Sequence, residues 1–343
     1  MKPNLLRHLD GENINRFPVW MMRQAGRYLS SYQDIRKQHG FWEMVSSPEL
    51  AAKVSLLPLA EFPMDGVIFF SDILTPPYGM GIPIELRESV GPVLDKPLRK
   101  SSEFELFKSF NPETHTGFIG EAFKQIRSEL PEGVALLGFA GAPWTVSSYM
   151  IEGNLKARKF SYVKEWLYRD PKDFFGALEM YGDATADYLI YQGKKGADMV
   201  QVFDTWLSEM PREIFLKWYR PQLNRIFDKV KKTGIKLVYF AKQSHHLLAD
   251  FVDLNIDVLS VDHLTSLSDV DKITKGKFSL QGNLDPIILF SSPEVVRAET
   301  KKIVAEARNL SRPAIMNLGH GILPKTPVEC VRAFVEEASR PWT

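Results

Sequence analysis

Short apolar runs recur along this chain, and each ends in small or polar residues. Many of the runs contain consecutive apolar residues, which is typical of strands buried on both faces of a parallel sheet. The pattern therefore predicts eight strands, at 17–22 (FPVWMM), 66–71 (GVIFFS), 134–140 (VALLGFA), 199–205 (MVQVFDT), 236–241 (KLVYFA), 258–262 (VLSVD), 278–283 (FSLQGN) and 314–319 (AIMNLG).

Segments with helical spacing of apolar residues lie between these runs. Several begin with a polar residue followed by proline, a pair that is typical of the first turn of a helix. The predicted starts are Ser47-Pro48, Asp170-Pro171, Ser292-Pro293 and Thr326-Pro327. A strand followed by a helix, repeated about eight times, indicates parallel strands joined by crossover helices.

The repeated unit predicts an α/β fold, specifically a closed (β/α)₈ TIM barrel. A doubly wound open sheet is the competing fold, but the first strand is not followed by a glycine-rich phosphate-binding turn. No linker or low-complexity tract divides the sequence, so residues 1–343 are expected to form a single domain. Residues 78–100 read as an inserted pair of short strands over the barrel mouth.

The amino-acid composition argues against several classes of function. The 43 Lys and Arg residues nearly balance the 42 Asp and Glu residues, so no global field favours a nucleic acid or an anionic membrane. The single cysteine, Cys330, excludes a disulfide framework and a thiolate metal cluster within one chain. The first residues lack a signal-peptide pattern, and glycines and proline interrupt the uncharged run 133–151, which we interpret as a strand, a turn and a helix start. We expect a cytoplasmic protein.

The functional side chains of such a barrel lie just after the carboxyl ends of its strands. Cationic groups and hydrogen-bond donors dominate these positions, and one carboxylate, Asp72, stands within an apolar run. Arg23 and Arg27 are four residues apart, so in a helical turn they would face the same way and grip carboxylates bidentately. His320 lies between two glycines, where backbone can approach a ligand.

Each of these residues also has a structural interpretation. The arginines can form surface ion pairs, Asp72 suits a turn cap before Thr-Pro-Pro, and His320 can be a turn histidine. In the functional interpretation, the same residues form a cationic region at the open end of the barrel. This region surrounds one carboxylate, which can only accept hydrogen bonds. Such a mouth suits a small polyanion that has inward-pointing N–H groups.

Other histidines raise the question of a zinc site. His245, His246 and His263 lie near strand ends, but they have no cysteine partner or local carboxylate at ligand spacing. We expect them to be satisfied loop or core histidines, and we expect no metal site.

One long block, PVWMMRQAGRY (18–28), closely resembles the uroporphyrinogen decarboxylase family. Further matching blocks follow in family order: FSDILTPPYGMG (70–81), GFAGAPWTVSSYMIEG (138–153), QVFDTW (201–206), LQGNLDP (280–286) and NLGHGILP (317–324). The resemblance implies a (β/α)₈ barrel that removes the four acetate carboxyls of uroporphyrinogen III stepwise, giving coproporphyrinogen III in haem and tetrapyrrole synthesis. It also implies an enzyme without cofactor or metal, and a homodimer.

The resemblance also implies the site residues, position by position. Besides Arg23, Arg27, Asp72 and His320, the matched positions include Tyr149 and Thr205, which would otherwise be an ordinary core aromatic residue and an ordinary hydroxyl. Departures from the family pattern occur at 206–211 (WLSEMP), at 241–248 (AKQSHHLL), and at His263, where tryptophan is common.

Two alternatives stay open at this level. Zinc-dependent, cobalamin-linked methyltransferases share this barrel ancestry, but they need a His/Cys ligand set, and Cys330 lies in the predicted C-terminal helix. A non-catalytic tetrapyrrole-binding relative would be expected to lose Asp72 or the paired arginines, and all of them are present.

Overall fold

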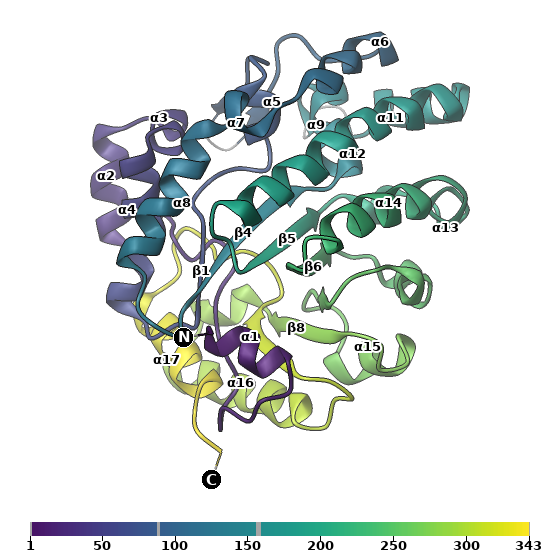
Figure 1. Cartoon of the computed structure of the whole chain (residues 1–343). Coiled ribbons are helices and arrows are strands. Elements are labelled where there is room, and N and C mark those ends of the chain that lie inside the picture. The colour runs from purple at the N-terminus through teal and green to yellow at the C-terminus, as the bar shows by residue number, and fades with distance from the viewer. Residues whose placement is uncertain (1, 88–89, 156–158, 343) are drawn as a thin grey trace.

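Seven parallel strands form the main sheet of the computed structural model, which describes residues 2–87, 90–155 and 159–342. Their order in the sheet follows the chain, so each strand pairs with the next along the sequence (Figure 1). The strands are β1 (Gly66–Ile68), β4 (Ala135–Gly141), β5 (Met199–Asp204), β6 (Lys236–Ala241), β7 (Val258–Ser260), β8 (Ser279–Leu284) and β9 (Ala314–Leu318).

The segment 18–22 lies between β9 and β1 and closes the barrel. Val19 forms a parallel bridge with Met316 of β9. On its other side, the backbone N–H of Asp65, next to β1, donates to the Val19 carbonyl at 2.8 Å. The first predicted strand is therefore a short extended segment with hydrogen bonds on both sides. The barrel prediction is confirmed, and the open sheet is wrong.

Helices connect successive strands and cover the outside of the sheet (Figure 1). The α-helices are α1 (Asn4–Leu9), α2 (Ser30–Gln38), α3 (Phe41–Ser46), α4 (Pro48–Glu61), α5 (Thr75–Gly79), α6 (Ser101–Phe104), α7 (Pro112–His115), α8 (Gly117–Glu129), α9 (Pro143–Glu152), α11 (Ser161–Arg169), α12 (Pro171–Lys194), α13 (Arg212–Ile214), α14 (Arg220–Lys231), α15 (Leu267–Ile273), α16 (Pro293–Ala307) and α17 (Val328–Ala338). The 3₁₀ and π segments are η1 (Glu105–Ser109), η2 (Leu207–Glu209), η3 (Phe215–Tyr219), η4 (His245–Asp253) and η5 (Pro286–Phe290).

Three of the four predicted helix starts are confirmed. The side chains of Ser47, Asp170 and Ser292 each accept the backbone N–H three residues further along, which satisfies a donor that the first helical turn leaves unpaired. The fourth start is wrong by one residue, since α17 begins at Val328. The Thr326 hydroxyl does not cap the helix, because it donates to the carbonyl of Leu323, three residues earlier, at 2.8 Å.

The predicted insertion is confirmed as β2 (Glu85–Arg87) paired antiparallel with β3 (Gly91–Val93). The start of the predicted range, 78–79, belongs to α5 instead, and 88–89 lie outside the described residues. Leu94, after β3, donates its backbone N–H to Gly153 at the end of α9 (2.8 Å). The insertion therefore packs against the helix that follows β4.

The uncharged run 133–151 folds as predicted, into β4, a turn and most of α9. Within the part of the chain that the structure describes, every helix is too short or too polar to cross a membrane.

Apolar side chains and an amide network fill the barrel. Gln281 donates to Gln201 at 3.0 Å and to Ser260 at 2.9 Å, and it accepts from the Trp20 indole at 2.9 Å. These polar groups are buried, and their mutual hydrogen bonds offset the cost of removing them from water. The apolar residues of this layer are Leu5, Trp20, Met22, Ile68, Ala135, Leu137, Phe139, Met199, Val238, Phe240, Val258 and Ile315. The barrel is thus a packed support for the side chains at its end.

Candidate active site

The loop that follows the segment 18–22 carries Arg23 and Arg27. The predicted helical turn is wrong: no helix forms within 22–29, and Arg23 has φ +60°, in the left-handed region. Buried Gln24 holds the loop, because its amide N–H donates to the Gly66 carbonyl at 3.2 Å and its own carbonyl accepts the Tyr28 hydroxyl at 2.7 Å. Both arginine side chains stay exposed.

Two glycines flank His320 because neighbouring groups of the protein come close. A Cβ at Gly321 would lie 2.5 Å from the Cδ atom of Arg23, and a Cβ at Gly319 would lie 2.4 Å from the backbone nitrogen of His263. Both separations are shorter than real contacts. The glycines therefore let Arg23 and His263 pack beside His320.

Asp72 follows β1 and is half-buried. Its Oδ1 atom accepts the Leu74 backbone N–H at 2.9 Å, so the turn-cap interpretation is confirmed. Among the described residues, Leu74 is the one hydrogen-bond donor to this carboxylate, which leaves Oδ2 for another donor. Burial raises the pKa of Asp72, and the Leu74 N–H and the charge of Arg23 partly offset this.

Tyr149 projects from α9 and is also half-buried. Its ring packs edge-on against Trp206, with ring centroids 6.4 Å apart. Burial raises the pKa of the Tyr149 hydroxyl, the negative charge of Asp72 acts in the same direction, and Arg23 opposes it. Tyr149, Asp72 and Arg23 therefore share one electrostatic environment, although they come from separate parts of the chain.

Thr205 comes directly after β5 and lies between two anchored neighbours. The buried carboxylate of Asp204 accepts hydroxyl hydrogen bonds from Thr145 (2.6 Å), Tyr219 (2.8 Å) and Tyr239 (2.9 Å). On the other side, the Trp206 N–H donates to the Thr145 hydroxyl at 3.2 Å. Sequence reasoning missed Asp204, and the available signal was a carboxylate inside the apolar run MVQVFDT.

His320 lies over the barrel interior, with its ring centroid 6.1 Å from that of Phe240. Burial lowers the pKa of His320 to about 3, and the nearby charges of Arg23, Lys242 and His263 act in the same direction. The imidazole is therefore neutral near pH 7, where it donates one N–H and carries no charge. Lys242, directly after β6, was not among the predicted site residues.

Arg23 is thus the common neighbour of the predicted site residues. Its charge acts on the pKa of Asp72, of Tyr149 and of His320. Thr205 is connected through the contact between Trp206 and Tyr149. Arg27 lies further along its loop, where it acts with Arg36 on the pKa of Tyr32, which burial raises.

The three histidines that raised the question of a zinc site have structural contacts. His246 bonds to the Met210 carbonyl at 3.0 Å, and His245 bonds to the Thr265 hydroxyl at 3.3 Å. His263 lies 3.9 Å from the carboxylate of Asp285. In the described ranges, no three His, Cys, Asp or Glu side chains gather closely enough to hold a metal ion.

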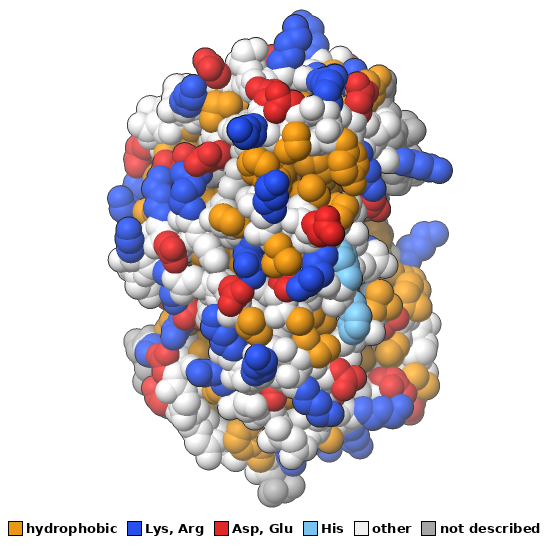
Figure 2. Space-filling model, turned by 90° about the vertical axis from the view of Figure 1, so that its right-hand side faces the viewer, with side chains coloured by type: hydrophobic (Ala, Val, Ile, Leu, Met, Phe, Trp, Pro, Cys, Tyr) orange, Lys and Arg blue, Asp and Glu red, His pale blue; other side chains and the backbone are white. Residues whose placement is uncertain are grey.

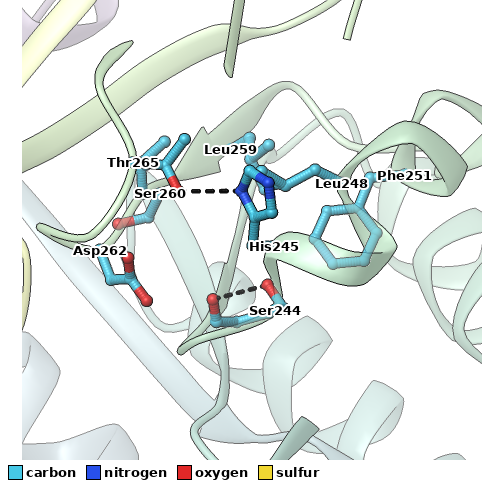
Figure 3. A pocket seen from close by; sticks show the side chains of 10 residues that line it. Ser244, His245, Leu248, Phe251, Leu259, Ser260, Asp262 and Thr265 are labelled. Atoms are coloured by element: carbon cyan, nitrogen blue, oxygen red, sulfur yellow. Dashed lines mark hydrogen bonds between the residues drawn. The ribbon is translucent and has the colours of Figure 1, made fainter. Parts of the chain in front are cut away.

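A small cavity lies beside His245, between η4 and the loop after β7 (Figure 3). Its volume is about 10 Å³, which is room for about one water molecule. It is therefore too small to hold a substrate. On the face shown in Figure 2, Lys and Arg side chains are interspersed among Asp and Glu side chains.

Similar proteins identify the family of this chain. The uroporphyrinogen decarboxylase (URO-D) family profile matches residues 1–341. A uroporphyrinogen decarboxylase of Synechococcus sp. (strain JA-2-3B'a(2-13)) is 39% identical over 98% of this chain and 96% of its own length. One from Thermus thermophilus is also 39% identical, over 97% of this chain and 96% of its own.

A solved structure extends the comparison of the fold. A methyltransferase from Methanosarcina mazei superposes with a TM-score of 0.79, covering 97% of this chain and 96% of its own, at 19% identity. At that identity the likeness concerns the fold alone. The match of the family profile along nearly the whole chain, together with the close relatives, places this protein in the uroporphyrinogen decarboxylase family.

Proposed function

We propose that this chain converts uroporphyrinogen III to coproporphyrinogen III by removing its four acetate carboxyl groups one at a time. The observation that carries the proposal is the hydrogen bonding of the Asp72 carboxylate. One oxygen of this carboxylate is held by the protein and the other is open, at a strand end beside Arg23. Family membership over nearly the whole chain supports the same reaction.

Decarboxylation needs an acceptor for an electron pair. When an acetate arm loses CO₂, the pair of the broken C–C bond must move to an electron-poor centre. A pyrrole that is protonated at its ring α-carbon is iminium-like and accepts the pair. The exocyclic carbon then takes a proton to become a methyl group, the ring proton leaves, and each CO₂ released corresponds to one net proton consumed. The substrate itself performs the role that electron-sink cofactors have elsewhere.

Asp72 is proposed to bind the centre of the macrocycle. Its open oxygen would accept the inward pyrrole N–H groups, and its charge would stabilise the cation that develops in the ring. The substrate donors would replace water around a carboxylate whose pKa burial has raised. This interaction is strongest in the charged transition state, so it accelerates the reaction as well as binding the substrate.

The surrounding residues are proposed to bind the periphery. Arg23 and Arg27 offer forked guanidinium groups to substrate carboxylates. His320 contributes as a neutral donor, because its pKa of about 3 keeps it uncharged. Tyr149 and Thr205 would orient one carboxylate, consistent with the packing of Tyr149 against the residue next to Thr205.

Three groups can deliver the proton: Arg23, a carboxyl group of the substrate, and an ordered water. Arginine is a weak acid because its pKa exceeds about 12. Arg23 nevertheless lies beside Asp72, and we propose that it takes part in the transfer by holding the reacting carboxylate.

We further propose a cytoplasmic homodimer that acts without cofactor or metal and binds neither nucleic acid nor membrane. Four large apolar side chains are exposed near the ends of β7 and β8, which supports self-association. They are Leu264, Ile287, Phe290 and Val295, with 41–61% of their surface accessible. Light scattering coupled to size exclusion tests the dimer.

One anaerobic assay tests the activity. Purified protein is incubated with uroporphyrinogen III, and the products are oxidised and separated by chromatography. We expect seven-, six-, five- and finally four-carboxyl products. Fully oxidised uroporphyrin is flat and has two inward N–H donors instead of four, so it should remain unchanged. Absence of the four-carboxyl product from uroporphyrinogen would refute the proposal, and direct conversion of uroporphyrin would refute the role of Asp72.

A further inference from the structure

Lys242 lies at the same level of the barrel as Thr205. Strands β5 and β6 are paired in parallel up to Asp204 opposite Ala241, and Thr205 and Lys242 are the residues that directly follow this last pair. Side chains alternate along a strand, and Phe240, two residues before Lys242, belongs to the barrel interior. Lys242 thus follows two residues after Phe240, whose ring packs near His320, and its charge reaches the His320 imidazole.

The ammonium group of Lys242 has no counter-ion within the described residues. The side chain is half-buried, and none of the hydrogen bonds or ion pairs of these residues includes it. The carboxylates on the neighbouring strand ends are already engaged. Asp204 accepts three hydroxyl groups, and Asp262 accepts the backbone N–H groups of Gln243 and Leu264.

Lys242 therefore adds a positive charge, unpaired among the described residues, to a region that already holds Arg23. Lys242, Arg23 and His263 all act on the imidazole of His320, so these groups face a common region. Half-burying a cation beside other cations is costly unless an anion joins them. A ligand that brings carboxylates would supply the missing negative charge.

We propose that Lys242 is a further substrate-binding residue, whose ammonium group binds a peripheral carboxylate of the tetrapyrrole beside the Thr205 hydroxyl. This inference rests on the proposed function. Uroporphyrinogen carries eight carboxylates, more than the two arginines, the neutral His320 and the Tyr149–Thr205 pair can hold. A lysine ammonium has three donors and a flexible stem, so it can follow a carboxylate on a mobile side arm.

Steady-state kinetics with uroporphyrinogen III under anaerobic conditions test the inference. Lys242→Met and Lys242→Gln should raise KM by about tenfold, the loss expected for one charged hydrogen bond, and leave kcat within about twofold. Lys242→Arg should restore most of the affinity. Lys301→Met removes the same charge from the exposed surface of α16 and should leave KM unchanged.

Salt dependence gives a second readout that a purely structural role would not affect. Raising ionic strength weakens charge pairing, so the KM of the wild type should rise more steeply with salt than that of Lys242→Gln. A wild-type KM in Lys242→Gln, or a loss confined to kcat, would overturn the inference. An inactive wild-type protein would instead refute the proposed function, so the two failures are distinct.

Discussion

The Asp204 carboxylate makes the protein less stable as pH rises. It is fully buried and accepts hydrogen bonds from three hydroxyl groups. Burial nevertheless dominates and raises the pKa of Asp204 from an ordinary 3.8 to about 6. Between these two values the folded state keeps a proton that the unfolded state has released, so the free energy of unfolding falls with increasing pH.

The size of this effect follows from the two pKa values. A difference from 3.8 to about 6, at about 1.4 kcal/mol per pH unit, corresponds to about 3 kcal/mol in total. The contribution is fully present below pH 3.8 and is lost as pH rises through about 6. Integration over the accessible range places about 2 kcal/mol of it between pH 4.5 and pH 7.

Asp204→Asn removes this titration and keeps the shape and one acceptor oxygen. Urea unfolding of both proteins, followed by tryptophan fluorescence at a series of pH values, gives their difference in unfolding free energy. We expect the variant to gain about 2 kcal/mol relative to the wild type from pH 4.5 to pH 7. All other titrating groups are shared, so their effects cancel in the difference.

Asp10→Asn provides the control. A hydrogen bond from Lys2 lowers the pKa of Asp10, so this carboxyl is ionised in both the folded and the unfolded protein over the same range. The difference in unfolding free energy between Asp10→Asn and the wild type should stay constant between pH 4.5 and pH 7. A flat line for Asp204→Asn as well would show that the buried carboxyl does not titrate as the structure indicates, and would refute the reasoning.

Three further perturbations test the site and its support. Asp72→Asn keeps the side-chain shape but loses the charge, so turnover of uroporphyrinogen should fall by orders of magnitude while the circular dichroism spectrum is unchanged. A near-normal rate would contradict the proposal that the Asp72 carboxylate binds the centre of the macrocycle. Gly321→Ala places a Cβ 2.5 Å from the Cδ atom of Arg23 and should displace that arginine, lowering kcat/KM without unfolding the protein. Asp65→Ala leaves Arg16, which pairs with Asp65 at 2.5 Å, without its partner and removes the acceptor of the Val19 N–H, so we expect a loss of about 3 kcal/mol in urea unfolding; a wild-type midpoint would mean that this junction does not support the first strand.

Much of the architecture was predictable from local pattern. The runs of consecutive apolar residues mark β1 and β4 through β9, because strands covered on both faces need apolar side chains on both. The loop of Arg23 was not predictable in the same way. Its left-handed backbone depends on Gln24, whose amide bonds to Gly66, a residue 42 positions away. Spacing along the chain cannot report such a contact.

The amino-acid sequence by itself determined the alternation of strands and helices, the family, and which polar groups follow each strand. Tertiary structure alone decided which of these groups meet and in what charge state. His320 is neutral, and the cationic neighbours that contribute to this lie on other strands. The role proposed for Lys242 rests on the register of β6 beside β5. Burial and Coulomb interactions depend on distances through space, and only the closed barrel sets those distances.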